Sequence, residues 1–381
     1  MEKTESGSVS TISGSIRDGV GGGDGVVGKK GLHYLTAAFF VITQMMGAGF
    51  LALPHAVADA GWFGVPMMVL FCSIVGFSGT RLGASWEIME ERWPEYKTQS
   101  CRQAYMEIAY RAFGDTGRKV CMAAVVVGLM GSTTVFAILA AQMLNSMVTD
   151  LSQCEWLLIV GAVLAPLTWF GTPKDFWQFS VGAVLATLTC VLIIFIQLLV
   201  DESAGLHPEP EYRNPTLITF SLSFGSILFA FAGAKVFPTI QNDMANRSEF
   251  GKSVVLAFIV VTSLYLLVAV TGYATLGFGV KSNILLSLNQ DSAAVTVAKS
   301  LQIVNLVGTY ILSFNTIGQA LEDMLGLPKN FCWQRVVLRT SLVCIEVLIG
   351  LGLPDFGKLL DLIGGSIVTT TTFILPTTTY M

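Results

Sequence analysis

The sequence predicts an all-α protein that crosses a membrane several times. Of its 381 residues, 53% are hydrophobic and only 13% are charged, whereas soluble domains contain about 25% charged residues. Apolar runs of about 20 residues, the length that a helix needs to cross the hydrocarbon layer, recur along the chain. A water-soluble domain with a single core is therefore excluded, and the lipid bilayer is the expected environment.

Composition also argues against several kinds of site. The seven cysteines form no CxxC pair, and there are only three histidines, so we expect no metal site, disulfide framework or cofactor. With a net charge of −4, the chain lacks the basic surface that nucleic acid requires. No nucleophile–base arrangement is evident either, so we expect no catalytic residues and no enzyme.

The first 33 residues are rich in serine and glycine and are expected to form a disordered cytoplasmic tail. Within this tail, the run from Gly23 to Lys30 matches the pattern GxGxxG. Because no strand precedes it and no βαβ unit follows, we interpret the run as linker rather than as a phosphate-binding loop.

Ten apolar segments follow the tail and are predicted to be membrane-spanning helices. They cover approximately 34–60, 62–86, 120–149, 156–171, 176–200, 216–241, 254–278, 293–325, 336–353 and 356–380. In the charged connection 87–119, apolar residues from Tyr105 to Phe113 recur at helical spacing. They predict a short helix, either on the membrane surface or packed against the base of the bundle.

Charge distribution predicts the orientation. Lysines and arginines gather in the tail, in the connection 87–119, and around Arg247 and Arg339, so both termini are expected in the cytoplasm. The acidic, proline-rich segment 201–215 would be an extracellular linker. It divides the spans into a first five-helix repeat, 34–200, and a second, 216–381.

The first span contains a predicted break in its helix. The stretch Met46–Pro54 places Gly47 and Gly49 inside an apolar segment and ends on a proline. Unwound backbone at membrane depth is tolerated only inside protein or beside a polar cavity, which would make this stretch a ligand cradle. Alternatively, the small residues allow two helices to pack closely.

A second break in the sixth span favours the cradle. The stretch Phe229–Pro238 occupies the corresponding position in the second half, and an odd number of spans per half inverts one half relative to the other. Paired interrupted spans indicate the binding site of a secondary transporter. Exposed amides at a half-helix start attract a carboxylate, and freed carbonyls accept hydrogen bonds from an ammonium group, as an amino acid would require.

The same stretches resemble the amino acid/auxin permease family. The resemblance rests on Gly47–Ala56 with Gly61-Trp62, Phe229–Gly233 with Phe237–Met244, Glu322-Asp323, Trp333–Thr340 and Asp361–Ser366. It implies a LeuT-like bundle of five plus five inverted helices that carries neutral amino acids, driven by protons or sodium. The family usually has an eleventh span, and we expect an isoform, a fragment or an incomplete gene model to explain why this chain ends after the tenth.

We expect the following residues to bind substrate: Thr43, Gly47, Ala48, Gly49, Phe50, Ser132, Phe229, Phe231, Ala232 and Gly233. The serine and threonine could instead bond within their helices, and the phenylalanines could fill the core. Sodium-coupled members of the family resemble one another in an asparagine at the position that aligns with Thr43. Because this chain has a threonine there, protons are favoured as the coupling ion.

Coupling candidates are Lys235, Glu346, Ser313 and Asn315. An ionisable side chain at membrane depth is costly and is by default a functional hypothesis. Lys235 could bind substrate or release a proton; alternatively, it extends its amine to the membrane surface or pairs with a carboxylate. Glu346 could carry a proton or serve as the packing partner of a buried base.

The sequence therefore predicts a proton-coupled symporter of neutral amino acids that works by alternating access. The alternatives are a sodium-coupled or vesicular carrier, an amino acid sensor without transport, and an inactive truncated chain. No address signal is evident, so the plasma membrane is the default expectation, with a lysosomal or vesicular membrane as the alternative.

Overall fold

A computed structural model describes residues 32–98, 101, 103–169, 177–327 and 332–380. Within these ranges the regular structure is helical, apart from an isolated bridge between Leu32 and Met244. The predicted all-α class is therefore confirmed. The tail predicted over residues 1–33, including the run Gly23–Lys30, lies almost entirely outside the described residues.

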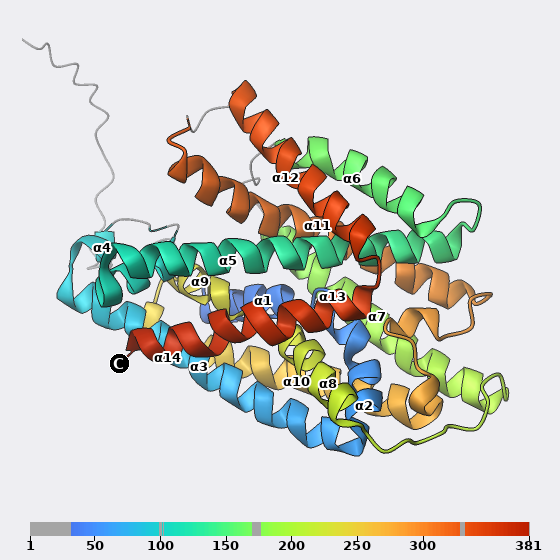
Figure 1. The fold of residues 1–381 in the computed structure, drawn as a ribbon. Coiled ribbons are helices and arrows are strands. Elements are labelled where there is room, and N and C mark those ends of the chain that lie inside the picture. Colours follow the sequence, from blue (N-terminus) through green and yellow to red (C-terminus); the bar gives the residue numbers. More distant parts are fainter. Residues whose placement is uncertain (1–31, 99–100, 102, 170–176, 328–331, 381) are drawn as a thin grey trace, which may run out of the picture. The chain divides into compact units, whose positions relative to one another are not determined.

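Most of the helices overlap the predicted apolar segments, but several extend beyond them, and the short helix Glu95–Thr98 lies in the connection 87–119 (Figure 1). Their bounds are α1 Tyr34–Met45, α2 Leu53–Ala60, α3 Gly64–Arg92, α4 Glu95–Thr98, α5 Ala104–Met147, α6 Gln153–Trp169, α7 Trp177–Ser203, α8 Leu217–Ala230, α9 Phe237–Asn242, α10 Phe250–Leu276, α11 Ala293–Met324, α12 Trp333–Gly352, α13 Phe356–Ile363 and α14 Leu375–Tyr380. Six helical segments among the described residues are long and apolar enough to cross a membrane, and shorter apolar helices accompany them, as expected for an integral membrane protein.

Both predicted breaks are present. The first span is interrupted between α1 and α2, where residues 46–48 are not helical and a 3₁₀ turn covers Gly49–Ala52. The sixth span is interrupted between α8 and α9, where a 3₁₀ turn, Ala234–Val236, follows residues 231–233. In each case a proline occupies the first turn of the second half-helix, where its missing N–H costs no hydrogen bond.

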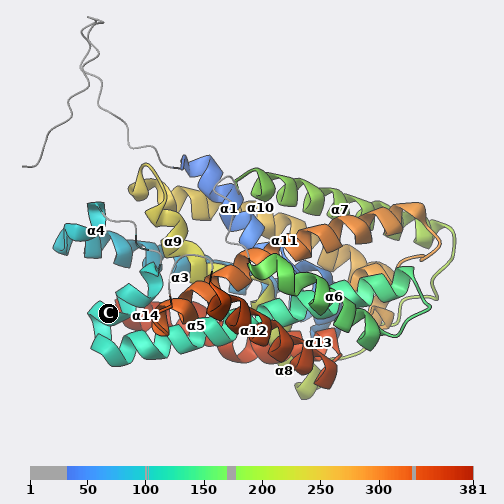
Figure 2. The ribbon, with the colours of Figure 1, turned by 90° about the horizontal axis from the view of Figure 1, so that it is seen from above.

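The broken helices lie inside the bundle. Helix α1 packs against α7 and α10, and α2 packs against α8 and α10. Helix α11 packs against α5 and α7, while α6 and α12 lie side by side against α5 (Figures 1 and 2). The two breaks are therefore surrounded by long helices, as unwound backbone in a membrane requires.

The short helix predicted around residues 105–113 forms the first part of α5. Gly114 interrupts it with φ 68°, a left-handed conformation that glycine adopts without strain. Tyr105 and Ile108 are buried, and the Tyr105 hydroxyl donates to the carbonyl of Thr371 at 2.6 Å. This segment therefore packs against the base of the bundle, which was the second of the two alternatives.

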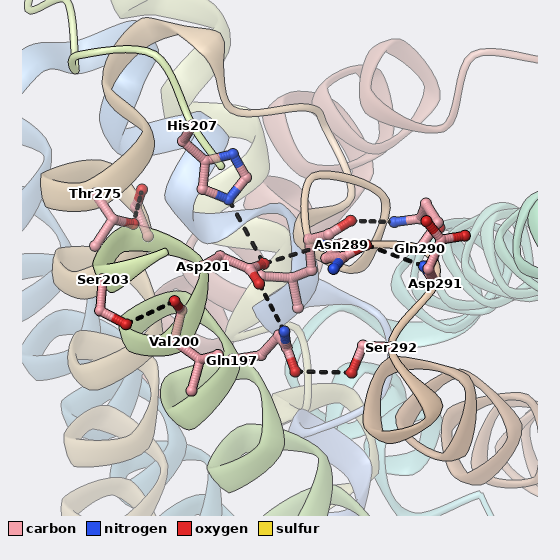
Figure 3. A network of polar contacts seen from close by, with 12 residues as sticks. Gln197, Val200, Asp201, Ser203, His207, Thr275, Asn289, Gln290, Asp291 and Ser292 are labelled. Carbon is pink, nitrogen blue, oxygen red and sulfur yellow. Dashed lines mark hydrogen bonds and ion pairs between the residues drawn. The ribbon is translucent and has the colours of Figure 1, made fainter. Parts of the chain in front are cut away.

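Helix α7 extends into the first residues of the predicted linker 201–215. Helix α7 continues to Ser203, and Asp201 is fully buried. Its carboxylate accepts hydrogen bonds from Gln197 Nε2 at 2.6 Å and from the Asn289 backbone N–H at 3.0 Å, and His207 Nε2 lies 3.6 Å away (Figure 3). Because these contacts join α7 to the α10–α11 connection, Asp201 is a structural acceptor rather than part of an acidic loop.

Candidate substrate-binding site

The freed carbonyls of the first break are bound by two amide side chains of α11. Gln302 Nε2 donates to the carbonyl of Gly47 at 2.8 Å, and Asn305 Nδ2 lies 3.5 Å from the carbonyl of Met46 and 3.0 Å from Thr187 Oγ1. Gln302 is 1% exposed and Asn305 is 3% exposed. Away from water these donors replace the helical hydrogen bonds that the break has removed.

One hydroxyl group reaches both breaks. The phenol of Tyr265, on α10, lies 2.7 Å from the carbonyl oxygen of Met45 and 3.0 Å from that of Ala230. Met45 ends α1 and Ala230 ends α8. Since a phenol carries a single proton, Tyr265 donates to one carbonyl at a time. It therefore connects the ends of the two interrupted helices through a bond that can be exchanged between them.

The two breaks also touch directly. A Cβ atom added to Gly49 would lie 2.4 Å from the Cα atom of Ala230, and one added to Gly233 would lie 2.7 Å from Met45 Cγ. Both distances are shorter than any real Cβ contact. The glycines are thus required for close packing, the second interpretation of the first break, and they also line the cavity described next.

A small cavity of about 30 Å³ lies where the breaks meet α5 and α11. Its walls are formed by Gln44, Met45, Gly47, Ala48, Gly49, Ser132, Phe136, Phe229, Ala232, Gly233, Lys235, Val236, Thr309 and Ser313. A polar cavity of this volume is large enough to hold water. It is too small to hold an amino acid with its walls in these positions.

Most of the residues predicted to bind substrate line this central cavity. They are Gly47, Ala48, Gly49, Ser132, Phe229, Ala232 and Gly233. Two coupling candidates, Lys235 and Ser313, lie in the same wall. The Lys235 amine donates to Ser132 Oγ at 3.2 Å and takes part in no ion pair between described residues.

Other predicted residues lie away from the cavity walls. Thr43 donates to the carbonyl of Phe39 at 2.9 Å within α1. Phe50 is fully buried in the core, and Phe231 is stacked on Phe258 with ring centroids 6.4 Å apart. Asn315 accepts a hydrogen bond from the Arg339 guanidinium at 2.9 Å.

Glu346 is not among the residues that line the cavity. Its carboxylate accepts hydrogen bonds from Thr133 Oγ1 at 2.6 Å and from the Tyr310 hydroxyl at 2.7 Å, and it is 2% exposed. Successive residues of a helix point about 100° apart. Ser132 and Thr309 consequently face the cavity, while their neighbours Thr133 and Tyr310 face Glu346.

Sequence reasoning missed Tyr265, Gln302 and Asn305, which hold the breaks in place. Gln302 and Asn305 are two amides three residues apart in an apolar helix, a spacing that puts them on one face. Polar side chains grouped in this way within a membrane segment are a usable signal of an interhelical contact. Tyr265 gives no comparable signal, because a tyrosine is common in such helices.

Comparisons with known proteins agree with this architecture. A family model described as transmembrane amino acid transporter protein matches residues 30–381. Amino acid transporter AVT1B of Arabidopsis thaliana is 28% identical over 88% of this chain, which spans only 62% of that protein. Lysine histidine transporter-like 4 of the same organism is 25% identical, with 92% of this chain and 81% of that protein covered.

A similarity in fold links the chain to a solved transporter. The structure of Mhp1, a nucleobase-cation-symport-1 family transporter, in a closed conformation with bromovinylhydantoin bound, superposes with a TM-score of 0.52. The similarity covers 90% of this chain and 78% of that chain at 14% identity. It supports the fold predicted from the paired broken helices.

Proposed function

The chain belongs to the transmembrane amino acid transporter family, and on this premise we propose that it carries neutral amino acids by proton-coupled symport. The observation that carries the proposal is the meeting of two interrupted helices at one cavity in the bundle interior. In secondary transporters such interrupted helices form the substrate site near the middle of the membrane. Alternating access would then open this cavity to each side in turn.

The cavity walls suit an amino acid backbone. The 3₁₀ turn that begins at Gly49 leads into α2, and the free N–H groups at such a start attract a carboxylate. Thr309 and Ser313 also line the cavity, and hydroxyl oxygens can accept hydrogen bonds from an ammonium group. Thr43, Phe50 and Phe231 do not line the cavity, so we propose that they affect substrate binding only by holding their helices in position.

The walls also favour a neutral side chain. Phe136, Phe229 and Val236 supply apolar surface, and Lys235 is the ionisable side chain among the lining residues. A cationic substrate side chain would meet a like charge in a closed site, which disfavours its binding. Neutral amino acids avoid this repulsion.

Protons are the favoured coupling ion. Sodium would need oxygen ligands at the breaks, and the carbonyls of Met45, Met46 and Gly47 would have to share their oxygens with Tyr265, Asn305 and Gln302. Lys235 lies in the wall of the same cavity, and a lysine away from water readily changes its protonation state. We assign Lys235 the proton-coupling role and Ser313 a supporting one, while Glu346 and Asn315 are assigned to bundle packing.

Reconstitution tests the proposal. Purified protein in liposomes would be screened for uptake of labelled amino acids under an inward pH gradient, an inward sodium gradient or neither. We expect uptake of neutral amino acids that the pH gradient stimulates and the sodium gradient does not. Binding without uptake would contradict the symporter and favour a sensor, and protein-free liposomes provide the background.

The plasma membrane, with both termini in the cytoplasm, is the proposed location. The charge distribution then puts the α5–α6 connection, with Cys154 exposed on α6, outside the cell. A membrane-impermeant thiol reagent added to intact cells should label Cys154, and Cys154→Ser should lose this label. Labelling only after permeabilisation would indicate the reverse topology or an internal membrane.

A further inference from the structure

Two further cavities lie between the central cavity and one end of the bundle. The second cavity, of about 40 Å³, is lined among others by Lys235, Val236, Thr239, Gln319 and Asp323. A third cavity, of about 410 Å³ and open to the surface, is lined by residues at the start of α5 and the end of α11, including Arg118 and Lys119. This is the end of the bundle that holds α4 and α14 (Figure 1).

Shared wall residues show that the three cavities lie in series. Lys235 and Val236 line both the central and the second cavity. Gln103, Ala320 and Asp323 line both the second and the third cavity. These shared residues form the walls between neighbouring cavities, so two such walls lie between the central cavity and the surface.

Each wall includes a residue whose side chain is hydrogen-bonded to a side chain of another element. At the first wall the Lys235 amine, from the second break, donates to Ser132 Oγ of α5 at 3.2 Å. At the second wall Gln103 Nε2, at the start of α5, donates to Asp323 Oδ2 of α11 at 3.2 Å. Each bond joins elements that must separate before a molecule can pass between them.

We propose that this series of cavities is the inner exit route of the substrate and that the Gln103–Asp323 hydrogen bond is its gate, which rests on the transport function proposed above. The Lys235–Ser132 bond forms the first barrier. Because Lys235 and Val236 belong to the segment that follows the second break, a movement of that segment on substrate binding would open the first barrier directly.

The chemistry of the outer wall suits a gate. The bond between Gln103 and Asp323 joins one amide to one carboxylate near the surface, where water can replace both partners at little cost when the bond opens. Two bases, Arg118 and Lys119, and two acids, Asp115 and Asp323, line the third cavity on the exit side. Its wall therefore offers charges of both signs to the two charged ends of a departing amino acid.

Thiol accessibility in the second cavity tests the gate. Thr239→Cys would be introduced on the α9 wall, and the protein in membranes would be treated with sulfonatoethyl methanethiosulfonate from the side that bears the α3–α5 connection. Labelling at residue 239 would be followed by peptide mass spectrometry, so that native cysteines do not contribute. Thr316→Cys, on the α11 wall of the same cavity, provides an independent reporter if the first variant misfolds.

We expect Gln103→Ala and Asp323→Ala each to raise the labelling rate several-fold, up to about tenfold, because each removes one hydrogen bond from the closed state. Gln319→Ala is the matched control: Gln319 lies one turn before Asp323 on α11 and lines the same cavity. Unchanged labelling in both gate variants, or an equal rise in Gln319→Ala, would overturn the gate. Labelling requires no transport, so absence of uptake by the wild-type protein would reject the transport function without deciding the gate.

Discussion

Gly49 and Ala230 bring the two broken helices into backbone contact: a Cβ atom on Gly49 would lie 2.4 Å from the Cα atom of Ala230. One residue belongs to the first break and the other ends α8. Because the neighbouring atom is backbone rather than the end of a flexible side chain, a larger residue must push the two elements apart. The site therefore depends on glycine for its geometry.

Gly49→Ala should strongly reduce transport. Overpacking of this kind costs about 1–3 kcal/mol, so we expect initial uptake rates in liposomes to fall by about tenfold. Gly251→Ala is the control, because Gly251 lies in α10 with nothing within 4 Å of an added Cβ atom. Normal uptake by Gly49→Ala would show that the contact between the breaks is not needed for transport.

Tyr265→Phe should weaken the junction of the breaks. Removal of the hydroxyl leaves the buried carbonyls of Met45 and Ala230 without that donor, at a cost of about 1–3 kcal/mol. We expect a lower melting temperature in detergent together with slower uptake. Tyr212→Phe is the matched control, since the Tyr212 hydroxyl also donates to a carbonyl, that of Ala274 at 2.8 Å, but is exposed to water. Equal effects of the two substitutions would argue against a special role for Tyr265.

Two substitutions at Lys235 test whether its side chain couples transport to protons or only forms a structural hydrogen bond to Ser132. If Lys235 releases a proton in each cycle, Lys235→Met should remove the stimulation of uptake by the pH gradient. Lys235→Arg should remove it as well, because arginine keeps its proton in proteins. If the amine only donates to Ser132, arginine should retain part of the activity. Normal pH-driven uptake by Lys235→Met would exclude the coupling role.

Glu346→Gln should affect stability rather than coupling. The carboxylate accepts hydrogen bonds from Thr133 and Tyr310, and glutamine keeps only one acceptor oxygen. We expect a loss of about 1–3 kcal/mol in stability and an unchanged stimulation by the pH gradient. Loss of that stimulation at an unchanged melting temperature would assign the proton to Glu346 instead.

Glu322→Ala should be the most destabilising of these changes. Its carboxylate pairs with the fully buried Arg339 at 2.7 Å and with Arg335 at 3.0 Å. An uncompensated buried charge costs about 3–5 kcal/mol. Lys252→Ala is the control, because the Lys252–Glu249 pair is exposed and pairs of that kind contribute only about 0–1 kcal/mol. Similar melting temperatures for the two variants would contradict a structural role of the Glu322–Arg339 pair.

The overlap between helix α7 and the predicted linker has a simple physical cause. Asp201 and Glu202 look like the beginning of an acidic loop, since a charged residue usually marks the end of an apolar span. In the structure Gln197 and the Asn289 backbone supply donors to the Asp201 carboxylate, so the helix continues to Ser203. Those donors come from elements distant in the sequence, which local composition does not report.

The sequence by itself determined the all-α class, the positions of the apolar helices and the places where two of them break. These features depend on local properties: the length of apolar runs, the flexibility of Gly47 and Gly49, and the missing N–H groups of Pro54 and Pro238. Family motifs added the expectation of amino acid transport. All of this information is carried by short stretches of the chain.

Only the tertiary structure decided which side chains face the cavity. Membrane helices are apolar around most of their surface, so periodicity does not reveal which face points inward, and Ser132 is distinguished from Thr133 only by a rotation of about 100°. Tyr265, Gln302 and Asn305 are polar residues that could have bonded within their own helices. They instead hold the breaks, because the bundle brings unsatisfied carbonyls from other segments within their reach.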